Sequence, residues 1–471
     1  MTEGMRRQAS LGRIKNIHMV GIGGIGMSSI AEVLLARGYR VSGSDLALGP
    51  VTERLAELGA TIHQGHAAEH VTDADVVVYS SAVRAAENSE TREAERRRIP
   101  LIRRAEMLGE LMRAKYGIGI AGTHGKTTTT SMAGLVVQEG GFDPTIIVGG
   151  KVTVFDSNAV SGEGDIIIIE ADEYDRTFLR LTPVLSVVTN VEADHMDIYD
   201  DMEDIKDAFV QFANSVPFFG AAILCLDDPA IREVLHRVHR RVITYGTSRQ
   251  AQIRAEGIVQ AGRVTRFGVM RDATLLGDVE LHTPGLHNVR NALAAIAVGL
   301  ELDIPFEKIQ RGLASFTGVD RRFEVKGEVR DIVVIDDYAH HPTEIEATLE
   351  AASSGWPERR IVAVFQPHLY SRTRDLQEEF ARAFYEADVL VVTEIYGARE
   401  EPIPGVTGRM LADLAARYGH RDVRFLEEKD AMPEYLARIT RPGDLVLTMG
   451  AGDIWKCGEA FLGILKTGEG T

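Results

Sequence analysis

The sequence predicts an α/β protein with three domains, for three reasons. At roughly 150 residues per domain, its 471 residues correspond to about three domains. Short apolar runs that end in Gly, Ser or Asp are each followed by a helical pattern, which is typical of parallel α/β units. This pattern begins three times along the chain, with changes near Arg113 and Asp320. We therefore expect domains over residues 1–112, 113–320 and 321–471.

Each block contains its own series of expected strands. The first block has apolar runs at residues 15–20 and 75–79, and the second has them at residues 116–121, 165–170 and 184–189. The third has five, at residues 332–335, 361–365, 389–393, 423–426 and 445–449. Residues 252–281 differ, because apolar and polar residues alternate there between turn glycines. That alternation predicts a small antiparallel sheet within the central block.

Composition excludes several classes of protein. With 69 acidic and 52 basic residues the formal charge is −17, which disfavours a nucleic-acid binder. The 45% hydrophobic and 26% charged residues are values of a globular chain. Cys225 and Cys457 are too few for a disulfide framework or a cysteine-rich zinc site. No signal peptide and no apolar stretch of about 20 residues is present, so we expect a cytoplasmic protein without membrane insertion.

The first glycine-rich loop, residues 20–28, lies between an expected strand and an expected helix. Gly21, Gly23 and Gly26 match the G-x-G-x-x-G pattern, and Asp45 ends the next strand. Such a loop lets backbone amides at a helix N-terminus receive a diphosphate. A tight turn without a ligand is the alternative. The pattern does not distinguish a dinucleotide from another ligand that carries a diphosphate.

The second loop, residues 122–130, predicts an ATP site. Gly125-Lys126-Thr127 supplies amides and an ammonium for the β- and γ-phosphates and a hydroxyl for Mg²⁺. The common P-loop spacing is not kept, because Ile120 stands where the first glycine is expected. We interpret the loop as a shortened P-loop.

Acidic residues follow two strands after this loop. Glu170, Asp172, Glu173 and Asp175 end one apolar run, and residues 189–197 place His195 among further carboxylates. A divalent cation beside ATP prefers oxygen ligands, so two such strand ends favour a metal site over solvated loops. A second Mg²⁺ held partly by His195 is also expected.

Two further groups of polar residues point to ligands. Asn288 and Asn291 lie three apart on an expected helix, where they could pair with an adenine edge or cap the helix. Residues 336–344 and 365–374 place histidines and arginines just after two strands of the third block. Side chains at the strand ends of an open α/β sheet predict a substrate-binding edge. A zinc pair at His340 and His341 is poorly supported, because adjacent histidines diverge.

Seven motifs in this order resemble those of the ATP-dependent Mur ligase family of peptidoglycan synthesis: GIGGIGMS, GTHGKTTTT, EADEYD, TNVEADHMD, GLHNVRNA, DDYAHHPTEI and FQPHLYSRTR. The resemblance extends over about residues 17–455. The resemblance implies a Rossmann-like N-terminal domain for a UDP-sugar, a central P-loop ATPase-type domain and a Rossmann-like C-terminal domain that closes over the site. It also resolves the first loop in favour of a UDP diphosphate and against NAD. The chain departs from the family pattern at Tyr174, often a Ser, and at Leu369, where some members carry Arg.

The resemblance further implies roles for individual residues. Those expected to bind ATP are Gly122, Thr123, His124, Gly125, Lys126, Thr127, Thr128, Asn288, Asn291, Arg322 and Asp337. Those expected to bind the UDP-sugar are Gly23, Gly24, Ile25, Gly26, Asp45, His66 and Ser81. Tyr338, His340, His368 and Arg372 are expected to line the muramoyl and amino-acid site. Thr127, Glu173 and His195 are the expected metal ligands, and Lys126, Glu173, His195 and His340 the expected catalytic residues.

The implied reaction joins L-alanine to the lactyl carboxylate of UDP-N-acetylmuramate through an acyl phosphate, using ATP and Mg²⁺, in a monomer or homodimer. One alternative adds a preformed tripeptide to the same sugar nucleotide. An NAD-dependent dehydrogenase would leave residues 122–128 unexplained. A non-catalytic ATP-binding regulator would have no need to retain Lys126, Thr127, Glu173 and His195 together.

Overall fold

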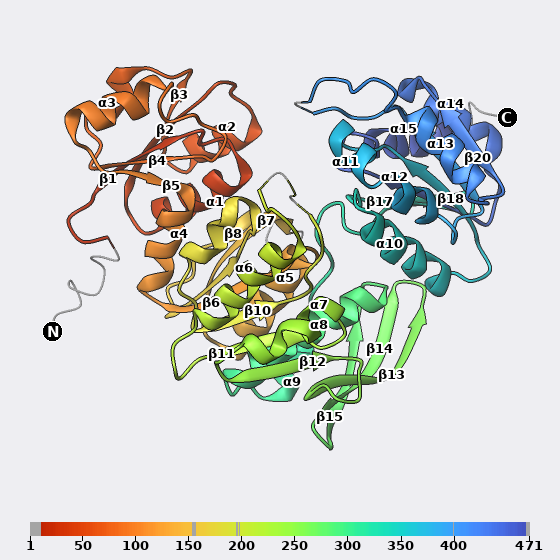
Figure 1. Ribbon diagram of the computed structural model, residues 1–471, viewed down its shortest axis with the longest axis horizontal. Helices are drawn as coiled ribbons and strands as arrows, with labels where there is room; N and C mark the ends of the chain where they lie inside the picture. Colours follow the sequence, from red (N-terminus) through yellow and green to blue (C-terminus); the bar gives the residue numbers. More distant parts are fainter. Residues whose placement is uncertain (1–10, 153–156, 195, 197, 399, 468–471) are drawn as a thin grey trace. The chain divides into compact units, whose positions relative to one another are not determined.

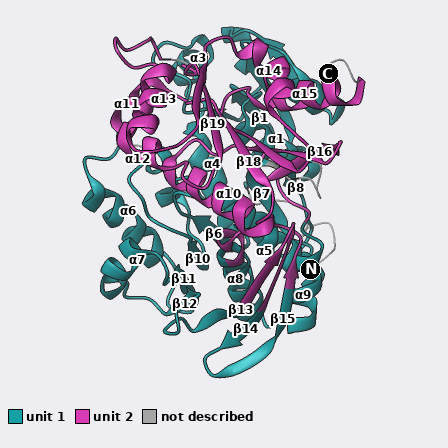
Figure 2. Ribbon diagram, turned by 90° about the vertical axis from the view of Figure 1, so that its right-hand side faces the viewer, with its two compact units in different colours: residues 1–256, 268–279, 290–316 teal, residues 257–267, 280–289, 317–471 magenta. Residues whose placement is uncertain are grey.

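The computed structural model describes residues 11–152, 157–194, 196, 198–398 and 400–467 (Figure 1). The described strands form three sheets of five, ten and six strands, which confirms the predicted three-domain α/β fold. The chain divides into two compact units (Figure 2). One unit comprises Met1–Glu256, Gly268–Val279 and Arg290–Phe316, and the other comprises Gly257–Phe267, Glu280–Val289 and Thr317–Thr471. None of the described helices combines the length and the hydropathy that crossing a bilayer requires.

The first sheet is parallel and has the order β3-β2-β1-β4-β5. Its strands are β1 (Asn16–Val20), β2 (Arg40–Asp45), β3 (Thr61–Gln64), β4 (Val76–Tyr79) and β5 (Leu101–Arg103). The helices that connect or follow them are α1 (Ile25–Ala36), α2 (Pro50–Glu57), η2 (Ala68–Val71), α3 (Ser89–Arg97) and α4 (Arg104–Arg113). The order reverses at β1, and in open α/β sheets such a reversal creates a ligand crevice outside the carboxyl ends of the strands.

The second sheet has the order β15-β14-β13-β12-β11-β10-β6-β9-β7-β8. Its strands are β6 (Tyr116–Ala121), β7 (Thr145–Val152), β8 (Ser157–Val160), β9 (Ile166–Glu170), β10 (Leu185–Val188), β11 (Ala221–Cys225), β12 (Val242–Gly246), β13 (Ile253–Ala261), β14 (Val264–Arg271) and β15 (Thr274–Leu281). Two residues join β13 to β14 and two join β14 to β15, a length that only antiparallel neighbours permit. The predicted antiparallel strands are therefore present, and they continue the central sheet.

Helices accompany the parallel part of this sheet. They are α5 (Lys126–Gly140), η3 (Tyr174–Arg180), α6 (Met202–Asn214), α7 (Pro229–Val234), η4 (Leu235–Arg237), α8 (Leu286–Glu301) and α9 (Phe306–Ala314). β6 pairs in parallel with β9 and β10, so the loops that follow these three strands emerge at one edge of the sheet. The first two α/β layers are in contact within their unit. Asn158 Nδ2 of β8 donates to the carbonyl of Ile25, the first residue of α1, at 2.9 Å.

The third sheet has the order β16-β17-β21-β18-β19-β20, with β16 antiparallel to β17 and the other pairs parallel. Its strands are β16 (Glu324–Val329), β17 (Ile332–Asp337), β18 (Arg360–Phe365), β19 (Val389–Thr393), β20 (Val423–Leu426) and β21 (Asp444–Met449). Its helices are α10 (Pro342–Gly355), α11 (Tyr370–Asp375), α12 (Gln377–Arg382), α13 (Gly408–Arg417), η5 (Lys429–Ala431), α14 (Met432–Ile439) and α15 (Trp455–Thr467).

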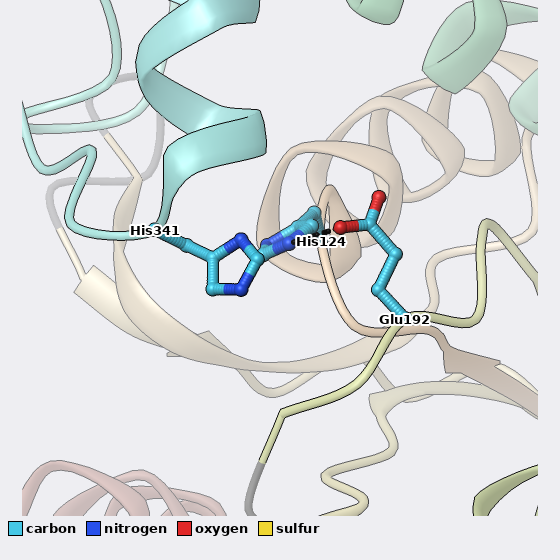
Figure 3. Close-up of side chains that lie close together, drawn as sticks. All are labelled: His124, Glu192 and His341. Atoms are coloured by element: carbon cyan, nitrogen blue, oxygen red, sulfur yellow. Dashed lines mark ion pairs between the residues drawn. The ribbon is translucent and has the colours of Figure 1, made fainter. Parts of the chain in front are cut away.

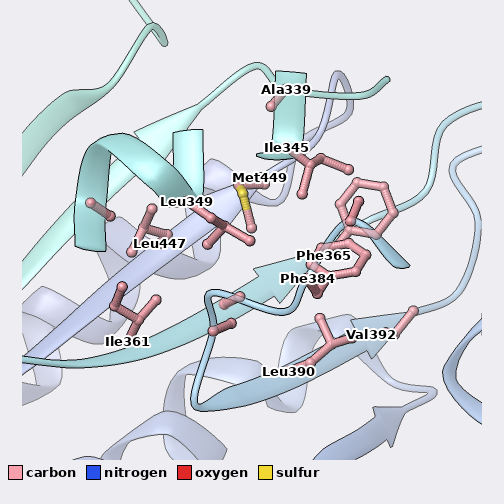
Figure 4. Close-up of a cluster of buried hydrophobic side chains, with 14 of the residues drawn as sticks. Ala339, Ile345, Leu349, Ile361, Phe365, Phe384, Leu390, Val392, Leu447 and Met449 are labelled. Carbon is pink, nitrogen blue, oxygen red and sulfur yellow. The ribbon is translucent and has the colours of Figure 1, made fainter. Parts of the chain in front are cut away.

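Both faces of the third sheet are buried. Ile335 and Leu447 belong to one apolar cluster, which includes Leu349 of α10, and this cluster is drawn in Figure 4. Val334 and Val446, their neighbours along β17 and β21, belong to a second cluster with residues of α14 and α15. Successive side chains of a strand point to opposite faces, so near-continuous apolar strands fill two cores. The polar residues after each strand are thereby left at the carboxyl edge.

Candidate active site

The first glycine loop follows β1 and is held by the end of β2. The amides of Gly21 and Ile22 donate to the Ser44 carbonyl at 2.8 and 3.1 Å. The amide of Gly23 donates to Asp45 Oδ2 at 2.9 Å. Gly21 has a φ of +79°, which favours glycine. Asp45, expected from the sequence to contact the UDP-sugar, thus lies directly against the loop and fixes its shape.

The absence of a side chain at Gly26 leaves space for the guanidinium of Arg104. A Cβ at Gly26 would overlap the guanidinium of Arg104, the first residue of α4. Arg104 Nη2 also lies 3.5 Å from Asp172 Oδ2, which follows β9 of the second sheet. Arg104 therefore links the first glycine loop to the acidic residues after β9. Sequence reasoning missed Arg104, because nothing local distinguishes it from the basic residues around it.

Ser81 and His66, the other two residues expected at the uridine end, occupy different environments. Ser81 lines a cavity of about 190 Å³ together with Arg103 and Arg104. His66 follows β3, and its Nδ1 lies 3.0 Å from a carboxylate oxygen of Glu90. Glu90 is fully buried and was not singled out from the sequence. In the sequence it looks like an ordinary acidic residue of a first helical turn, which suits the helix dipole.

The second loop joins β6 to α5 as a P-loop does. Gly122 and Gly125 have φ values of +141° and +80°. A Cβ at Gly122 would overlap the Thr189 hydroxyl, and one at Gly125 would lie 2.6 Å from Asn291 Oδ1. These two positions therefore require glycine for both backbone and space. The next residue, Lys126, begins α5.

Lys126 is held over its own loop. Its Nζ donates to the carbonyls of Gly122 at 2.6 Å and Thr123 at 3.0 Å, and it lies 2.8–2.9 Å from both carboxylate oxygens of Glu173. Burial alone would lower the pKa of Lys126, but the carboxylates of Glu173 and Asp172 outweigh it and raise that pKa. The side chains of Lys126 and Glu173 are only 14% and 4% exposed. A protonated ammonium is thus held where the loop amides gather.

The acidic residues after β9 fit a divalent cation. Burial raises the pKa of Glu170, and hydrogen bonds from the Gly149 amide and the Thr127 hydroxyl oppose that rise. The Gly149 contact to Glu170 Oε2 is 2.6 Å. The buried carboxylate of Glu173, the partly exposed one of Glu170 and the Thr127 hydroxyl supply hard oxygen donors, which is the chemistry that Mg²⁺ prefers. His195, the expected third ligand, lies outside the described residues.

The end of β10 braces the P-loop from the other side. The Thr189 hydroxyl donates to the His124 carbonyl at 2.6 Å, and Asn190 Oδ1 accepts from the His124 amide at 2.8 Å. The Thr123 hydroxyl accepts from the Glu192 amide at 2.9 Å. His124 Nε2 lies 3.5 Å from Glu192 Oε2, the ion pair drawn in Figure 3. The motif around His195 was expected to bind metal, and its first residues hold the P-loop in place.

The two asparagines of α8 make different contacts. Asn291 Oδ1 accepts from the Thr129 hydroxyl of α5 at 3.1 Å. Asn288 Nδ2 donates to the Pro284 carbonyl at 2.7 Å. Asn291 thereby supports the first turns of the P-loop helix, while its expected contact with adenine, like that of Asn288, stays a prediction.

In the third domain, two of the residues expected to contact nucleotide share one cluster. Arg322 Nη1 donates to Glu344 Oε1 at 3.1 Å. The Asp337 carboxylate accepts from the amides of Phe323 and Ala339, both at 2.8 Å. Burial raises the pKa of Asp337 to about 6, although the nearby Arg322 acts in the opposite direction.

Three of the four residues expected at the substrate edge form a chain of rings. The ring centroids of Tyr338 and His340 are 5.1 Å apart, and those of His340 and His368 are 5.9 Å apart. His368 in turn stacks on Tyr396, which follows β19, with ring centroids 5.9 Å apart. Burial, aided by the neighbouring His340 and Arg372, lowers the pKa of His368 to about 4. This edge thus presents a neutral imidazole beside an arginine.

His340 is oriented by acceptors. Its Nδ1 lies 2.9 Å from the Tyr338 carbonyl and 3.2 Å from Glu344 Oε2. A carbonyl oxygen only accepts, so Nδ1 carries the hydrogen, and Nε2 of the neutral ring is left as an acceptor. The arrangement suits a group that receives a proton from a ligand.

Models of one family match most of the chain in three consecutive parts. The model described as "Mur ligase family, catalytic domain" matches residues 16–116, "Mur ligase middle domain" matches residues 120–299, and "Mur ligase, glutamate ligase domain" matches residues 321–452.

Curated relatives and solved structures agree with these matches. The UDP-N-acetylmuramate–L-alanine ligase of Salinibacter ruber is 65% identical over 99% of this chain and 98% of its own length. The ligase of the same name from Geobacter sulfurreducens is 57% identical over 97% of this chain and 98% of its own length. The crystal structure of a UDP-N-acetylmuramate–alanine ligase from Thermotoga maritima is similar, with a TM-score of 0.79 and 29% identity over 97% of this chain and 100% of that one. A murein peptide ligase from Psychrobacter arcticus has a TM-score of 0.67 and 26% identity over 96% and 98%.

Proposed function

The chain belongs to the Mur ligase family, and we propose that it joins L-alanine to the lactyl carboxylate of UDP-N-acetylmuramate while ATP is converted to ADP and phosphate. The observation that carries this proposal is the link through Arg104. It connects a diphosphate loop at Gly26 to the acidic residues beside the P-loop, within one compact unit. Two curated relatives with 65% and 57% identity bear the name of this reaction.

ATP would lie against the amides of residues 122–128, with the Lys126 ammonium on its β- and γ-phosphates. Thr127 and Glu173, with His195 from outside the described residues, would hold Mg²⁺. When bound, the metal neutralises charge on the phosphates. Lys126 is paired with Glu173 in the structure, so ATP would replace one carboxylate partner of the ammonium with phosphate oxygens.

The first step forms a carboxylic–phosphoric anhydride. An oxygen of the lactyl carboxylate attacks the γ-phosphorus, and the bond to the β-phosphate oxygen breaks to release ADP. Lys126 and the loop amides stabilise the negative charge on the transferred phosphoryl group. The Gly21–Gly26 loop and Arg104 would hold the UDP diphosphate and thereby fix the carboxylate near Lys126.

The second step forms the amide. The neutral amine of L-alanine attacks the acyl carbon, and phosphate leaves with its electron pair. The attacking nitrogen loses one proton as the amide forms, and we assign this proton to His340 Nε2, which is left as an acceptor by the contacts of Nδ1. Arg372, beside His368, would pair with the alanine carboxylate. We place the reaction in the cytoplasm and expect a monomer or homodimer.

Phosphate release tests this proposal. The chain is incubated with ATP, Mg²⁺ and UDP-N-acetylmuramate, and L-alanine, glycine, L-serine or the alternative tripeptide is added in turn. We expect rapid release and a ligated product with L-alanine, and little with the tripeptide. Faster ligation of the tripeptide would reassign the chain to peptide recycling. No phosphate release with any acceptor would contradict the ligase proposal.

A further inference from the structure

A fully buried carboxylate lies in the first domain, outside the mechanism described above. Glu90 is in the first turn of α3, where Asn88 Oδ1 caps the helix by accepting from the Glu90 amide at 2.9 Å. The Glu90 side chain is 0% exposed. Burying an isolated carboxylate is costly, so the contacts that compensate it define what it does.

Four side chains surround this carboxylate. Oε1 lies 2.6 Å from His70 Nδ1 and 3.5 Å from His18 Nε2, and Oε2 lies 2.6 Å from the Ser44 hydroxyl and 3.0 Å from His66 Nδ1. Burial would raise the pKa of Glu90, but hydrogen bonds from His18, Ser44 and His70 outweigh it and lower that pKa to about 2. Glu90 is therefore ionised, and an ionised carboxylate only accepts hydrogen bonds.

An acceptor facing Nδ1 selects the tautomer of each imidazole. Because Glu90 can only accept, Nδ1 of His66 and of His70 carries the hydrogen, and Nε2 of each neutral ring is left as an acceptor. His63 stacks on His70 with ring centroids 4.0 Å apart, which also fixes the plane of the His70 ring. Burial and the neighbouring His70 and His18 lower the pKa of His63.

The cluster lies directly beneath the first glycine loop. Ser44 donates its hydroxyl to Glu90, while its carbonyl accepts the amides of Gly21 and Ile22. His66 and His70 are 18% and 14% exposed, whereas His18 and Glu90 are at 0%. His66 follows the carboxyl end of β3, and Glu90 begins the helix that follows β4, so the cluster lies near the carboxyl ends of the strands, where open α/β sheets bind ligands.

We propose that Glu90 is a positioning residue for nucleoside recognition: it holds His66 and His70 as hydrogen-bond acceptors that receive a donor of the uridine, either the uracil N3–H or the ribose 2′-hydroxyl. This inference rests on the proposed function, because that function supplies the uridine ligand. A phosphate-only ligand offers no donor for an Nε2 acceptor, so the cluster recognises the nucleoside and leaves the diphosphate to the glycine loop.

The tautomers can be measured directly. Long-range ¹H–¹⁵N spectra of the ¹⁵N-histidine-labelled protein distinguish Nδ1–H from Nε2–H, and loss of a signal in His66→Gln and in His70→Gln assigns the two rings. We expect Nδ1–H for both in the wild-type protein. Nε2–H at His66 would overturn the inference, and this measurement does not depend on whether a Glu90 variant folds.

A pair of variants on the same helix tests the consequence for binding. Glu90→Gln removes the acceptor-only group, and Glu93→Gln, at a partly exposed glutamate paired with Arg96, is the matched control. We expect Glu90→Gln to raise KM for the UDP-sugar about tenfold, as for the loss of one hydrogen bond to an oriented group, with kcat and KM for ATP and L-alanine unchanged. Glu93→Gln should change none of these values. An unchanged KM in Glu90→Gln would overturn the inference.

UDP analogues separate this inference from the proposed function. Calorimetric titration of the full chain compares UDP with N3-methyl-UDP and 2′-deoxy-UDP, which each lack one donor. We expect the wild-type chain to bind one analogue about tenfold more weakly than UDP, and Glu90→Gln to lose that discrimination. If UDP and both analogues bind equally to an active wild-type enzyme, the inference fails and the ligase proposal stands. If the wild-type chain binds no UDP and releases no phosphate, the proposed function itself fails.

Discussion

Replacing Lys126 by methionine should destabilise the protein as well as inactivate it. Methionine keeps the length of the side chain but removes the ammonium, which lies 2.8–2.9 Å from both oxygens of Glu173. The partners are 14% and 4% exposed, so the variant leaves a buried carboxylate without its counter-charge. Breaking a buried ion pair in this way costs about 3–5 kcal/mol.

That cost has a measurable size. The unit that holds Lys126 has about 300 residues, and at about 2.1 cal/mol/K per residue 1 kcal/mol shifts its Tm by about 1.6 °C. We therefore expect a decrease of about 5–8 °C in the transition of this unit. Ligase activity should fall at least about 100-fold, because a positive group aimed at the transferred phosphoryl is lost. Differential scanning calorimetry and a coupled ADP assay measure the two effects.

A second substitution separates the two effects. Lys126→Met combined with Glu173→Gln removes both charges, so Tm should recover most of its loss while activity stays low. Lys15→Met, at an exposed lysine of the same unit, should leave both quantities unchanged. The reasoning is refuted if Lys126→Met unfolds at the wild-type temperature, or if the double variant is no more stable than the single one.

Three other predictions concern the glycine loops and the third domain. Gly26→Ala displaces the Arg104 guanidinium, so KM for the UDP-sugar should rise at least about tenfold while KM for ATP stays constant. The same KM for the UDP-sugar in the variant and the wild type would contradict the role assigned to Arg104. A Cβ at Gly125 (φ +80°) would lie 2.6 Å from a side-chain oxygen of α8, so Gly125→Ala should raise KM for ATP. A Cβ at Gly141 (φ +95°) would meet open space, so Gly141→Ala should lower only the free energy of unfolding, by about 1–2 kcal/mol. Equal effects of the two substitutions on KM for ATP would contradict this argument. The folded pKa of His368, about 4, lies below the unfolded value of 6.5, so the stability that this ring contributes above pH 6.5 is lost as the pH falls toward 4. Between pH 6.5 and pH 4, the free energy of unfolding measured in urea should therefore fall by about 3 kcal/mol less in His368→Gln than in the wild type. Parallel pH profiles of the two proteins would refute the burial argument.

Local patterns were sufficient to predict the framework of the fold. Apolar strands bounded by glycine or acidic residues led to three α/β sheets, and the alternation over residues 252–281 led to antiparallel strands, which the structure confirms. The P-loop glycines were also recognisable, because Gly122 and Gly125 adopt backbone conformations that favour glycine. Local sequence carries these signals because strand periodicity and positive φ are properties of short segments.

Contacts between distant segments were not predictable in this way. Arg104 reaches Gly26 from 78 positions away, and Glu90 gathers histidines from β1, from the segment after β3 and from η2. Neither residue has a local feature that distinguishes it from a surface charge. The contact of the Asp45 carboxylate with the Gly23 amide was not predicted either, and the expected contact of Asp45 with the uridine stays a prediction. Such contacts depend on strand order and on loop paths, which single-sequence patterns do not specify.

The central claim is that the carboxylate of the UDP-sugar is activated as an acyl phosphate beside Lys126. UDP-N-acetylmuramate labelled with ¹⁸O in both oxygens of the lactyl carboxylate tests it directly, with ATP, Mg²⁺ and L-alanine and mass analysis of the released phosphate. If a carboxylate oxygen attacks the γ-phosphorus, that oxygen leaves with the phosphate, so each phosphate carries one ¹⁸O and the amide product keeps the other. Unlabelled phosphate formed in step with the amide product would contradict the account.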